Sequence, residues 1–224
     1  MDALHAFLKE NPHQHIIWDW NGTLLDDFEI CVDIVSSIAQ KQGLGPVSKQ
    51  QYRDAFQFPI TNFYLQLGFN FEKTPFKILA VEFIQAYQAK VLECSLFNKV
   101  DSFLNTTKQQ GISHSVLSAA AETDLKQLLS HHKIDHHFDH IYGIHDRFAD
   151  GKLERGKQLM HDSKIQPKQT ILIGDTDHDL EVGKILGVNV VLVAQGHQCY
   201  SKLSKIHPWV LEHRALSPYL NPAD

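Results

Sequence analysis

The sequence predicts an α/β fold in which a doubly wound, mostly parallel sheet carries a group of helices inserted after its first strand. Three observations support this prediction. Four apolar or β-branched runs recur along the chain, segments with helical spacing separate the later runs, and the interval between the first two runs holds helical patterns. Strands that alternate with helices are typical of parallel α/β sheets.

The strand candidates are continuous apolar runs, which favour central strands covered on both faces, as in a Rossmann-like sheet. The strong candidates are HIIWD at 15–19, SHSVLS at 113–118, TILIG at 170–174 and VNVVLVA at 188–194. Weaker candidates lie at 140–143 and 208–211. Helical spacing is found at 121–132, 153–163 and 178–187. Gly187 closes the last of these segments, and glycine suits a helix C-terminus.

The interval from 26 to 97 contains no convincing strand. Asp26 followed by Glu29 resembles a capping box that opens a helix running to about Gly43. Further helices are expected within 48–56, 60–68 and 74–94. In the last of them, apolar residues recur at steps of three and four, which predicts one apolar face.

An interval of this length is unusual because strand-to-helix connections are normally short. We therefore expect a helical cap domain at 26–97 and an α/β core formed by 1–25 and 98–224. The connections at 24–28 and 95–99 would then be the two hinges between them.

Composition and charge argue against several functional classes. A net charge of -5 gives no reason to expect nucleic acid or an anionic membrane as a partner. The N-terminal segment lacks the basic start and apolar core of a signal peptide, and no apolar run approaches the roughly 20 residues of a membrane span. Cys31, Cys94 and Cys199 form no CxxC pair and are expected to be free thiols. We expect a cytoplasmic protein, either a monomer or a homodimer.

Polar residues follow the carboxyl ends of the predicted strands, which is where an open parallel sheet binds ligands. They are Asp19, Asn21, Gly22 and Thr23 after the first strand, Ser118 after the second, Lys152 after the weak third, and Asp175, Asp177 and Asp179 after the strand at 170–174. Three carboxylates, a lysine and two hydroxyls are thus expected to converge at one edge of the sheet.

Clustered carboxylates repel one another unless a positive charge lies between them. Mg²⁺ suits such a group because it takes a few oxygen ligands and leaves room for a phosphate and waters. Asp19 and Asp175 are expected to bind the ion directly, with Asp179 as a further ligand or as a partner of the ligands. Lys152 is expected to neutralise Asp19 and an incoming phosphoryl group.

The remaining polar residues suit phosphate. Ser118 and Thr23 can donate hydrogen bonds to phosphoryl oxygens. Gly22 lets the chain turn so that backbone N–H groups face the phosphate. Together these groups predict a carboxylate nucleophile and an electrophile held by a metal and a lysine.

The segments DWNGTLLDD, SVLSA, DGKLERGK and ILIGDTDHDLEV resemble the four motifs of the haloacid dehalogenase superfamily. The helical insert resembles the cap of its phosphoglycolate-phosphatase-like branch, and the resemblance extends from Ile16 to about Gly196. It implies a Mg²⁺-dependent phosphatase acting on a small phosphorylated metabolite. In such enzymes the first aspartate attacks phosphorus, and water hydrolyses the resulting aspartyl-phosphate.

The resemblance also implies roles by position. Asp19 would be the nucleophile and Lys152 the catalytic lysine, with Lys157 as a second candidate that lies deeper in the following helix. The implied substrate-binding residues are Asn21, Gly22, Thr23, Ser118 and Ala119. The implied metal ligands are Asp19, Asn21 through its backbone carbonyl, Asp175 and Asp179.

Position 21 departs from the family pattern, which usually has a second aspartate there. That aspartate protonates the leaving oxygen and then deprotonates the attacking water, whereas the Asn21 amide cannot transfer a proton near neutral pH. General acid–base catalysis typically contributes about 10²–10⁴-fold, so we expect slower turnover with intact binding.

Three functions are compatible with this departure. The first is a slow or selective phosphatase that uses a low-pKa leaving group or another proton donor, for which Asp177, His145 and a cap side chain are candidates. The second is a phosphotransferase with a slowly hydrolysed phospho-aspartate, and the third is a module that binds a phosphometabolite or a partner. We expect the phosphatase because every other catalytic position is filled. A dehalogenase is not expected, because dehalogenases do not need the acidic metal-binding motif.

Other features have simpler interpretations. The histidine-rich segment at 131–145 could hold a transition metal, but its spacing fits no compact ligand motif, so a partly solvated surface is expected. At its end, His145 and the adjacent Asp146 lie closest to Lys152 in the sequence. The segment from Gly196 to Gln198 follows the last strong strand and could approach the site, but an ordinary loop is expected. Trp20 could pack against the cap hinge or line the substrate cavity.

Overall fold

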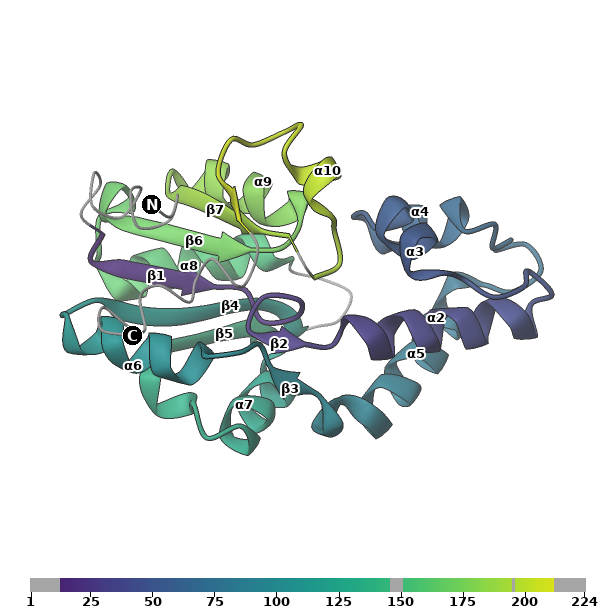
Figure 1. The fold of residues 1–224 in the computed structure, drawn as a ribbon, viewed down its shortest axis with the longest axis horizontal. Helices are drawn as coiled ribbons and strands as arrows, with labels where there is room; N and C mark the ends of the chain where they lie inside the picture. The colour runs from purple at the N-terminus through teal and green to yellow at the C-terminus, as the bar shows by residue number, and fades with distance from the viewer. Residues whose placement is uncertain (1–12, 146–150, 195, 212–224) are drawn as a thin grey trace.

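A six-stranded parallel sheet forms the core of the computed structural model, which describes residues 13–145, 151–194 and 196–211 (Figure 1). In spatial order the strands are β5 (His140–Ile144), β4 (Ser113–Ala121), β1 (His15–Trp18), β6 (Thr170–Gly174), β7 (Asn189–Val193) and β8 (Val210–Leu211). Every neighbouring pair is parallel. The predicted doubly wound sheet is confirmed, and all six strand candidates form strands.

The strand order creates a switch point in the middle of the sheet. From β1 the chain moves outward to β4 and β5, and then returns to β6 on the other side of β1. The connections that leave β1 and β6 therefore run in opposite directions. Such a point leaves a crevice at the carboxyl ends of the two strands, and ligands bind there in open α/β sheets.

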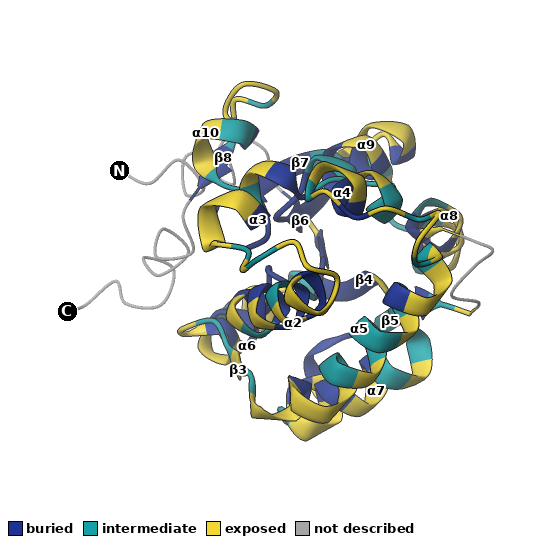
Figure 2. Ribbon diagram, turned by 90° about the vertical axis from the view of Figure 1, so that its right-hand side faces the viewer, coloured by how far each residue is buried: buried dark blue, intermediate teal, exposed yellow. Residues whose placement is uncertain are grey.

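Helices cover both faces of the sheet. They are α6 (Val100–Gln109), α7 (Glu122–His131), α8 (Lys152–Ser163), α9 (Asp177–Leu186) and the short α10 (Tyr200–Leu203). Ile16 and Trp18 of β1 pack with residues of α6 and α7, whereas Ile17 packs on the opposite face with residues of α8 and α9. Because both faces are covered, the central strands carry apolar residues on both faces. Their buried polar side chains have partners, as where His15 of β1 hydrogen-bonds to Ser115 of β4. Figure 2 shows these strands as mostly buried, with the exposed residues on the outer helices.

Four helices between the first and second sheet strands form a second packing unit, called the helical insert below. They are α2 (Phe28–Lys41), α3 (Lys49–Ala55), α4 (Ile60–Gln66) and α5 (Phe76–Lys90). Their buried apolar residues form their own hydrophobic cluster, which includes Val35, Phe63 and Leu79. Figure 1 shows the insert beyond the carboxyl ends of the sheet strands. The domain boundaries at 26 and 97 stay a prediction.

The start of the insert differs from the expected capping box at Asp26 and Glu29. Asp26 belongs to β2 (Leu25–Asp26), which pairs antiparallel with β3 (Ser95–Leu96), and α2 begins only at Phe28. The two connections between core and insert run side by side and satisfy each other's backbone groups, so Asp26 is held as a strand. Capping boxes occur instead at Ser48 with Gln51 and at Thr176 with Asp179.

None of the described helices combines the length and the apolar character that crossing a membrane requires. The three cysteines are free, as predicted.

Candidate active site

The predicted acidic group assembles at the switch point of the sheet. Asp19 directly follows β1 and Asp175 directly follows β6, so the two strands that diverge there deliver one carboxylate each. Asp179 joins them from the first turn of α9. Each of the three residues places a carboxylate oxygen within 4.8 Å of those of the others, and all three side chains are buried.

Lys152 supplies the positive charge of this group. Its Nζ donates to Asp19 Oδ1 and, at 2.5 Å, to Asp179 Oδ1, while the side chain is only 4% exposed. Burial alone would lower the pKa of Lys152, but the two carboxylates outweigh it and hold the pKa above its ordinary value. The lysine is therefore a fixed cation against Asp19. Lys157, the second candidate, lies exposed and pairs with Glu154 at 2.6 Å.

Asp179 uses both carboxylate oxygens within the protein. Oδ1 accepts from Lys152, and Oδ2 accepts from the backbone N–H of Thr176 at 3.0 Å and from its hydroxyl at 2.7 Å. These contacts lower its pKa against the opposing effect of burial. Of the two roles expected for Asp179, they favour holding Lys152 and Asp19 in place.

Asp19 and Asp175 are less well compensated. Burial raises the pKa of each, and mutual repulsion among the three carboxylates adds to the rise, against lowering contributions from Lys152 and His197. The group thus holds three buried carboxylates, and its lysine contacts two of them, Asp19 and Asp179. All the ligand atoms that this group offers are carboxylate oxygens, and they have too little positive charge beside them. Such a group fits a Mg²⁺ ion, and a bound divalent cation would favour the ionised form of Asp19 and Asp175.

Two glycines allow the chain to fold over Asp175. Gly22 has φ +69°, and a Cβ there would lie 2.3 Å from Asp175 Oδ2. A Cβ on Gly196 would lie 2.1 Å from the same oxygen and 2.5 Å from the Gly22 carbonyl. No side chain beyond hydrogen fits at either position, because real Cβ atoms do not approach other atoms so closely.

The segment from Gly196 to Gln198 is part of the site, which corrects the expectation of an ordinary loop. The backbone N–H of His197 donates to Asp175 Oδ2 at 2.6 Å, and its ring lies 3.1 Å from the Tyr52 hydroxyl of the insert. Gln198 Nε2 donates to Asp177 Oδ1 at 2.8 Å. The segment therefore connects the acidic group to the helical insert. Its position after a strand allowed an approach to the site, but the individual contacts could not be predicted, because the partners lie far away along the chain.

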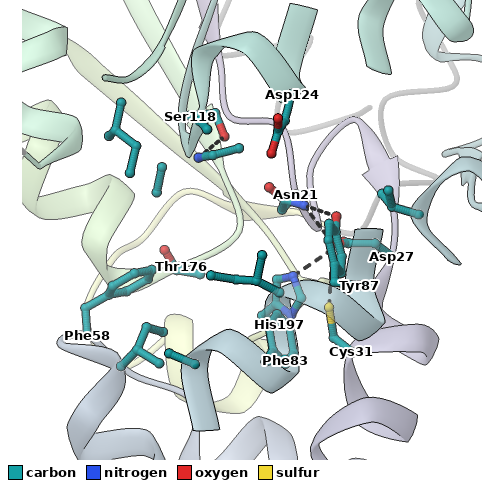
Figure 3. A pocket seen from close by; sticks show the side chains of 18 of the residues that line it. Asn21, Asp27, Cys31, Phe58, Phe83, Tyr87, Ser118, Asp124, Thr176 and His197 are labelled. Carbon is teal, nitrogen blue, oxygen red and sulfur yellow. Dashed lines mark hydrogen bonds and ion pairs between the residues drawn. The ribbon is translucent and has the colours of Figure 1, made fainter. Parts of the chain in front are cut away.

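Asn21 is engaged by two residues, one of which sequence reasoning missed. Its Nδ2 donates to Asp27 Oδ2 at 2.7 Å and to the Tyr87 hydroxyl at 2.6 Å, and Tyr87 donates in turn to Asp27 Oδ2 at 2.9 Å (Figure 3). The Gly22 N–H donates to Asp27 Oδ1 at 2.9 Å. Asp27 was visible in the sequence only as the second of two consecutive aspartates.

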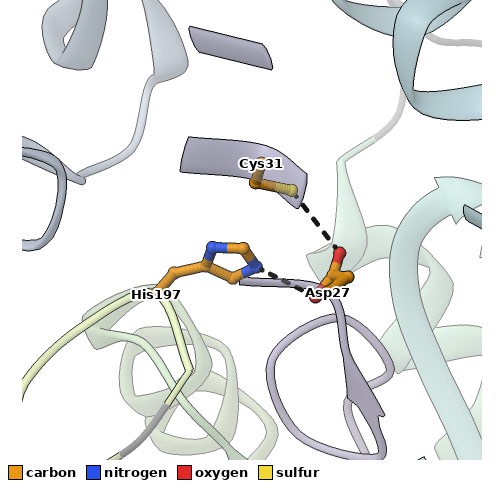
Figure 4. A group of neighbouring side chains, drawn as sticks. All are labelled: Asp27, Cys31 and His197. Atoms are coloured by element: carbon orange, nitrogen blue, oxygen red, sulfur yellow. Dashed lines mark hydrogen bonds and ion pairs between the residues drawn. The ribbon is translucent and has the colours of Figure 1, made fainter. Parts of the chain in front are cut away.

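Asp27 also pairs with His197. Its Oδ1 lies 3.4 Å from His197 Nε2, and the Cys31 thiol approaches Oδ2 at 3.7 Å (Figure 4). Burial opposes the charged form of both partners. The pairing outweighs it, raising the pKa of His197 to about 9 and lowering that of Asp27 below its ordinary value. The two residues form a buried ion pair at neutral pH.

A cavity of about 640 Å³ opens between the acidic group and the insert. Asp19, Asn21, Ser118, Ala119 and Lys152 are among the described residues that line it, whereas Gly22 and Thr23 are not. The structure thus brings most of the predicted substrate-binding residues to one cavity.

The hydroxyls of Thr23 and Ser118 differ in their surroundings. Thr23 Oγ1 faces Asp175 Oδ1 at 3.5 Å, so its hydroxyl contacts a carboxylate and not the cavity. Ser118 Oγ accepts from the Ala120 N–H at 3.1 Å, and its own hydrogen can still be donated into the cavity.

The other candidates lie outside the site or beside it. His145 is exposed and Asp146 lies outside the described residues. Trp20 is fully buried and packs with Leu24 and Leu25 beneath the connection to the insert, which agrees with the hinge interpretation. In the histidine-rich segment, His131 and His136 are exposed as predicted, but His137 is buried and pairs with Asp101 at 2.8 Å.

Comparisons with known proteins identify the family and relatives of the chain. The family model described as haloacid dehalogenase-like hydrolase matches residues 16–193. A phosphoglycolate phosphatase of Synechococcus elongatus is 22% identical over 204 residues, covering 89% of this chain and 92% of that protein. The tyrosine-protein kinase PtkA of Mycobacterium tuberculosis is 25% identical over 130 residues, which span 58% of this chain but only 45% of the kinase.

Solved structures share the fold. A predicted phosphatase from Clostridium acetobutylicum has a TM-score of 0.77 with 20% identity, and the match covers 93% of this chain and 98% of that one.

Proposed function

The chain belongs to the haloacid dehalogenase-like hydrolase family, and we propose that it is a phosphomonoester phosphatase whose nucleophile is Asp19. One observation carries the proposal: the two strands at the switch point place Asp19 and Asp175 side by side, with the buried Lys152 on Asp19. The phosphatase names among its relatives support the same activity.

Asp19 and Asp175 would hold Mg²⁺, together with the backbone carbonyl of Asn21 and, directly or through Lys152, Asp179. When bound, Mg²⁺ would neutralise the carboxylates and draw negative charge from the phosphoryl oxygens. This cofactor would account for a group of three buried carboxylates in which Lys152 contacts only Asp19 and Asp179.

The protein's own groups account for the remaining chemistry. Lys152 favours the ionised form of Asp19 and fixes its orientation. An Asp19 oxygen attacks phosphorus, the bond to the leaving oxygen breaks, and that oxygen keeps the electron pair. Water then attacks the phosphorus of the aspartyl-phosphate and releases inorganic phosphate and the free carboxylate. Ser118 can donate a hydrogen bond to a phosphoryl oxygen throughout.

The proposal is tested by measuring phosphate release from a panel of phosphomonoesters with Mg²⁺ and with EDTA. Asp19→Asn should lower kcat by at least about 10³-fold, because the amide is not a nucleophile. Asp54→Asn is the matched control, since Asp54 is an exposed carboxylate on α3. Activity that survives in Asp19→Asn, or that ignores EDTA, would contradict the proposal.

A further inference from the structure

We propose that the substrate is an aryl phosphate, a phosphomonoester of a phenolic hydroxyl on an uncharged aromatic group. This inference rests on the proposed phosphatase function and specifies the substrate of the same site. Two independent features carry it: the side chains that line the cavity, and the state of the Asn21 side chain.

The cavity wall that the insert contributes is apolar and rich in aromatic side chains, with aliphatic residues such as Ile60 and Ile84 among them. The aromatic side chains from the insert include Phe56, Phe58, Phe63, Phe76, Phe83 and Tyr87. Phe83 and Tyr87 are stacked, with ring centroids 5.9 Å apart and an interplanar angle of 16°, and both are only half-buried (Figure 3). An aromatic ligand placed against such rings covers apolar surface and gains ring contacts that an aliphatic ligand of similar size lacks.

The charges of the cavity disfavour an anionic leaving group. Among the described lining residues, the cations are Lys77, Lys152 and His197, and there is no arginine. His197 is already paired with Asp27. Lys152 is bound by two carboxylates, and Lys77 is an exposed residue in the first turn of α5. Asp124 also lines the cavity. A second carboxylate or phosphate on the substrate would find no unpaired buried cation among the described lining residues and would meet Asp124, whereas a neutral ring needs no such partner.

Asn21 gives no help to the leaving oxygen. Its amide group has two hydrogens, and Nδ2 donates to both Asp27 and Tyr87. The position that carries a proton donor in related phosphatases therefore supplies neither a proton nor a free hydrogen bond. Asp177 and His145, two of the alternative proton donors, are not among the described residues that line the cavity. A leaving group that departs well as an anion is favoured because it needs no proton from this position.

Phenols meet this requirement and aliphatic alcohols do not. A phenol such as that of tyrosine has a pKa of about 10, whereas the O–H of water, which aliphatic alcohols resemble, has a pKa of about 15.7. When Asp19 attacks phosphorus, the bond to the phenolic oxygen breaks and its electron pair stays on the phenolate, which takes a proton from solvent. Water then cleaves the bond between phosphorus and the Asp19 oxygen, and its proton passes to the released phosphate.

Three phosphate esters test the aromatic cavity wall and the engaged Asn21 amide separately. Phenyl phosphate and benzyl phosphate share an aromatic ring but differ in the basicity of the leaving oxygen. The leaving groups of benzyl phosphate and phosphoglycolate are both aliphatic alkoxides. Of these two esters, only phosphoglycolate lacks an aromatic ring and carries a second anionic group. Initial rates with Mg²⁺ should give a kcat for phenyl phosphate at least about 10²-fold above that for benzyl phosphate. The KM for phosphoglycolate should exceed that for benzyl phosphate by about tenfold or more.

Variants of the wall test the contact with the ring. Phe83→Ala should raise the KM for phenyl phosphate by about 5- to 10-fold and leave that for phosphoglycolate within about twofold. Phe71→Ala is the control, because Phe71 packs on Phe76 in the insert but does not line the cavity. Phe83→Leu, which keeps an apolar side chain and the fold, should raise the KM for phenyl phosphate by a smaller factor.

Two kinds of failure are distinguishable. If phosphoglycolate is hydrolysed with a kcat/KM equal to or above that of phenyl phosphate, and Asp19→Asn abolishes this activity, the aryl specificity is wrong while the phosphatase stands. The aryl specificity is also wrong if Phe83→Ala and Phe71→Ala change the KM for phenyl phosphate equally. If the folded protein releases no phosphate from any of the three esters, both the phosphatase and its specificity are overturned.

Discussion

The contact between Asn21 and Asp27 gives a structural reason for an amide at position 21. The family resemblance presents Asn21 as a lost carboxylate. In the structure, a buried carboxylate lies 2.7 Å from the Asn21 amide nitrogen and belongs to Asp27. Asp27 is also paired with His197, so it is ionised and needs donors around it. An aspartate at position 21 would place a second, partly buried carboxylate against the buried carboxylate of Asp27.

We therefore expect Asn21→Asp alone to give no gain in activity. The exchange Asn21→Asp with Asp27→Asn keeps the shape of the pair, restores one amide donor and puts the carboxylate at position 21. This double variant should raise kcat for benzyl phosphate by about tenfold or more, and kcat for phenyl phosphate much less, because only the alkoxide needs the proton. Steady-state rates for the two single variants and the double variant measure the coupling. Equal gains from Asn21→Asp with and without the second change would refute it.

Lys152 offers a second prediction at this scale. Lys152→Met removes the cation from between Asp19 and Asp179, and breaking a buried pair in this way typically costs about 3–5 kcal/mol. Urea unfolding at pH 8 in EDTA should show a loss of this size, part of which Mg²⁺ restores by binding only the folded state. Lys157→Met is the matched control, because Lys157 is exposed on the same helix. Comparable losses in the two variants would contradict a buried ion pair.

The secondary structure elements were largely predictable. The central strands are largely apolar because residues on both of their faces are buried. This local pattern made the strands and their flanking helices predictable from the sequence. The failures involve long-range partners. Asp26 is held as a strand by Ser95, and His197 reaches the site through Asp175 and Asp27. No local pattern marks such pairings.

The loop that contains Gly196 gives the prediction for this scale. Gly196→Ala would place a Cβ 2.1 Å from Asp175 Oδ2, so the carboxylate or the loop must move. We expect Mg²⁺ to bind at least about tenfold more weakly, as is typical when the surroundings of a metal ligand are disturbed. Isothermal titration calorimetry with Mg²⁺ measures this directly.

Gly45→Ala serves as the control for the loop variant. Gly45 has φ +77° and open space around it, so alanine strains the backbone there without a collision. Unchanged Mg²⁺ affinity in Gly196→Ala would show that the loop does not position Asp175.

At the scale of the whole molecule, the site could be predicted because topology converts sequence order into proximity. Asp19 and Asp175 are far apart in the chain, but both follow strands that diverge at the switch point. The aromatic cavity wall could not be predicted in this way. Its residues lie on helices of the insert, whose placement over the sheet edge is a tertiary property. The steps of three and four on α5 correctly gave an apolar face, but not that Phe83 and Tyr87 on it line a cavity.

Two buried histidines tie the stability of the sheet to pH. His15 and His114 lie in the central strands β1 and β4, and burial lowers their pKa values to about 4 and about 3. His114 Nδ1 accepts from Trp18 Nε1 at 3.1 Å, and Thr107 Oγ1, which donates to the Phe103 carbonyl, lies 2.9 Å from His114 Nε2. The Thr107 oxygen therefore accepts from His114, which is held as the neutral tautomer with its hydrogen on Nε2.

The lowered pKa of His114 fixes the direction in which the free energy of unfolding changes with pH. Below pH 6.5 the unfolded chain protonates His114 while the folded protein does not, so the free energy of unfolding falls as the pH falls from 6.5 toward 3. One such histidine costs about 2 kcal/mol between pH 6.5 and 5. Asp19 and Asp175 act in the opposite direction without metal, because their raised pKa values favour the folded state at lower pH.

The difference in free energy of unfolding between the native protein and the variant His114→Asn removes the contribution of Asp19 and Asp175, because both proteins share it. His114→Asn should be less stable than the native protein at pH 7.5, because it loses buried hydrogen bonds. The difference in free energy of unfolding should shrink by about 2 kcal/mol at pH 5, because only the native protein carries the cost of keeping His114 unprotonated. Urea unfolding in saturating Mg²⁺ at the two pH values provides the four free energies. His161→Asn is the control, because the His161 side chain is 88% exposed. A difference for His114→Asn that stays constant with pH would mean that the folded protein takes up a proton at His114, and that its hydrogen bonds to Trp18 and Thr107 do not hold the neutral ring.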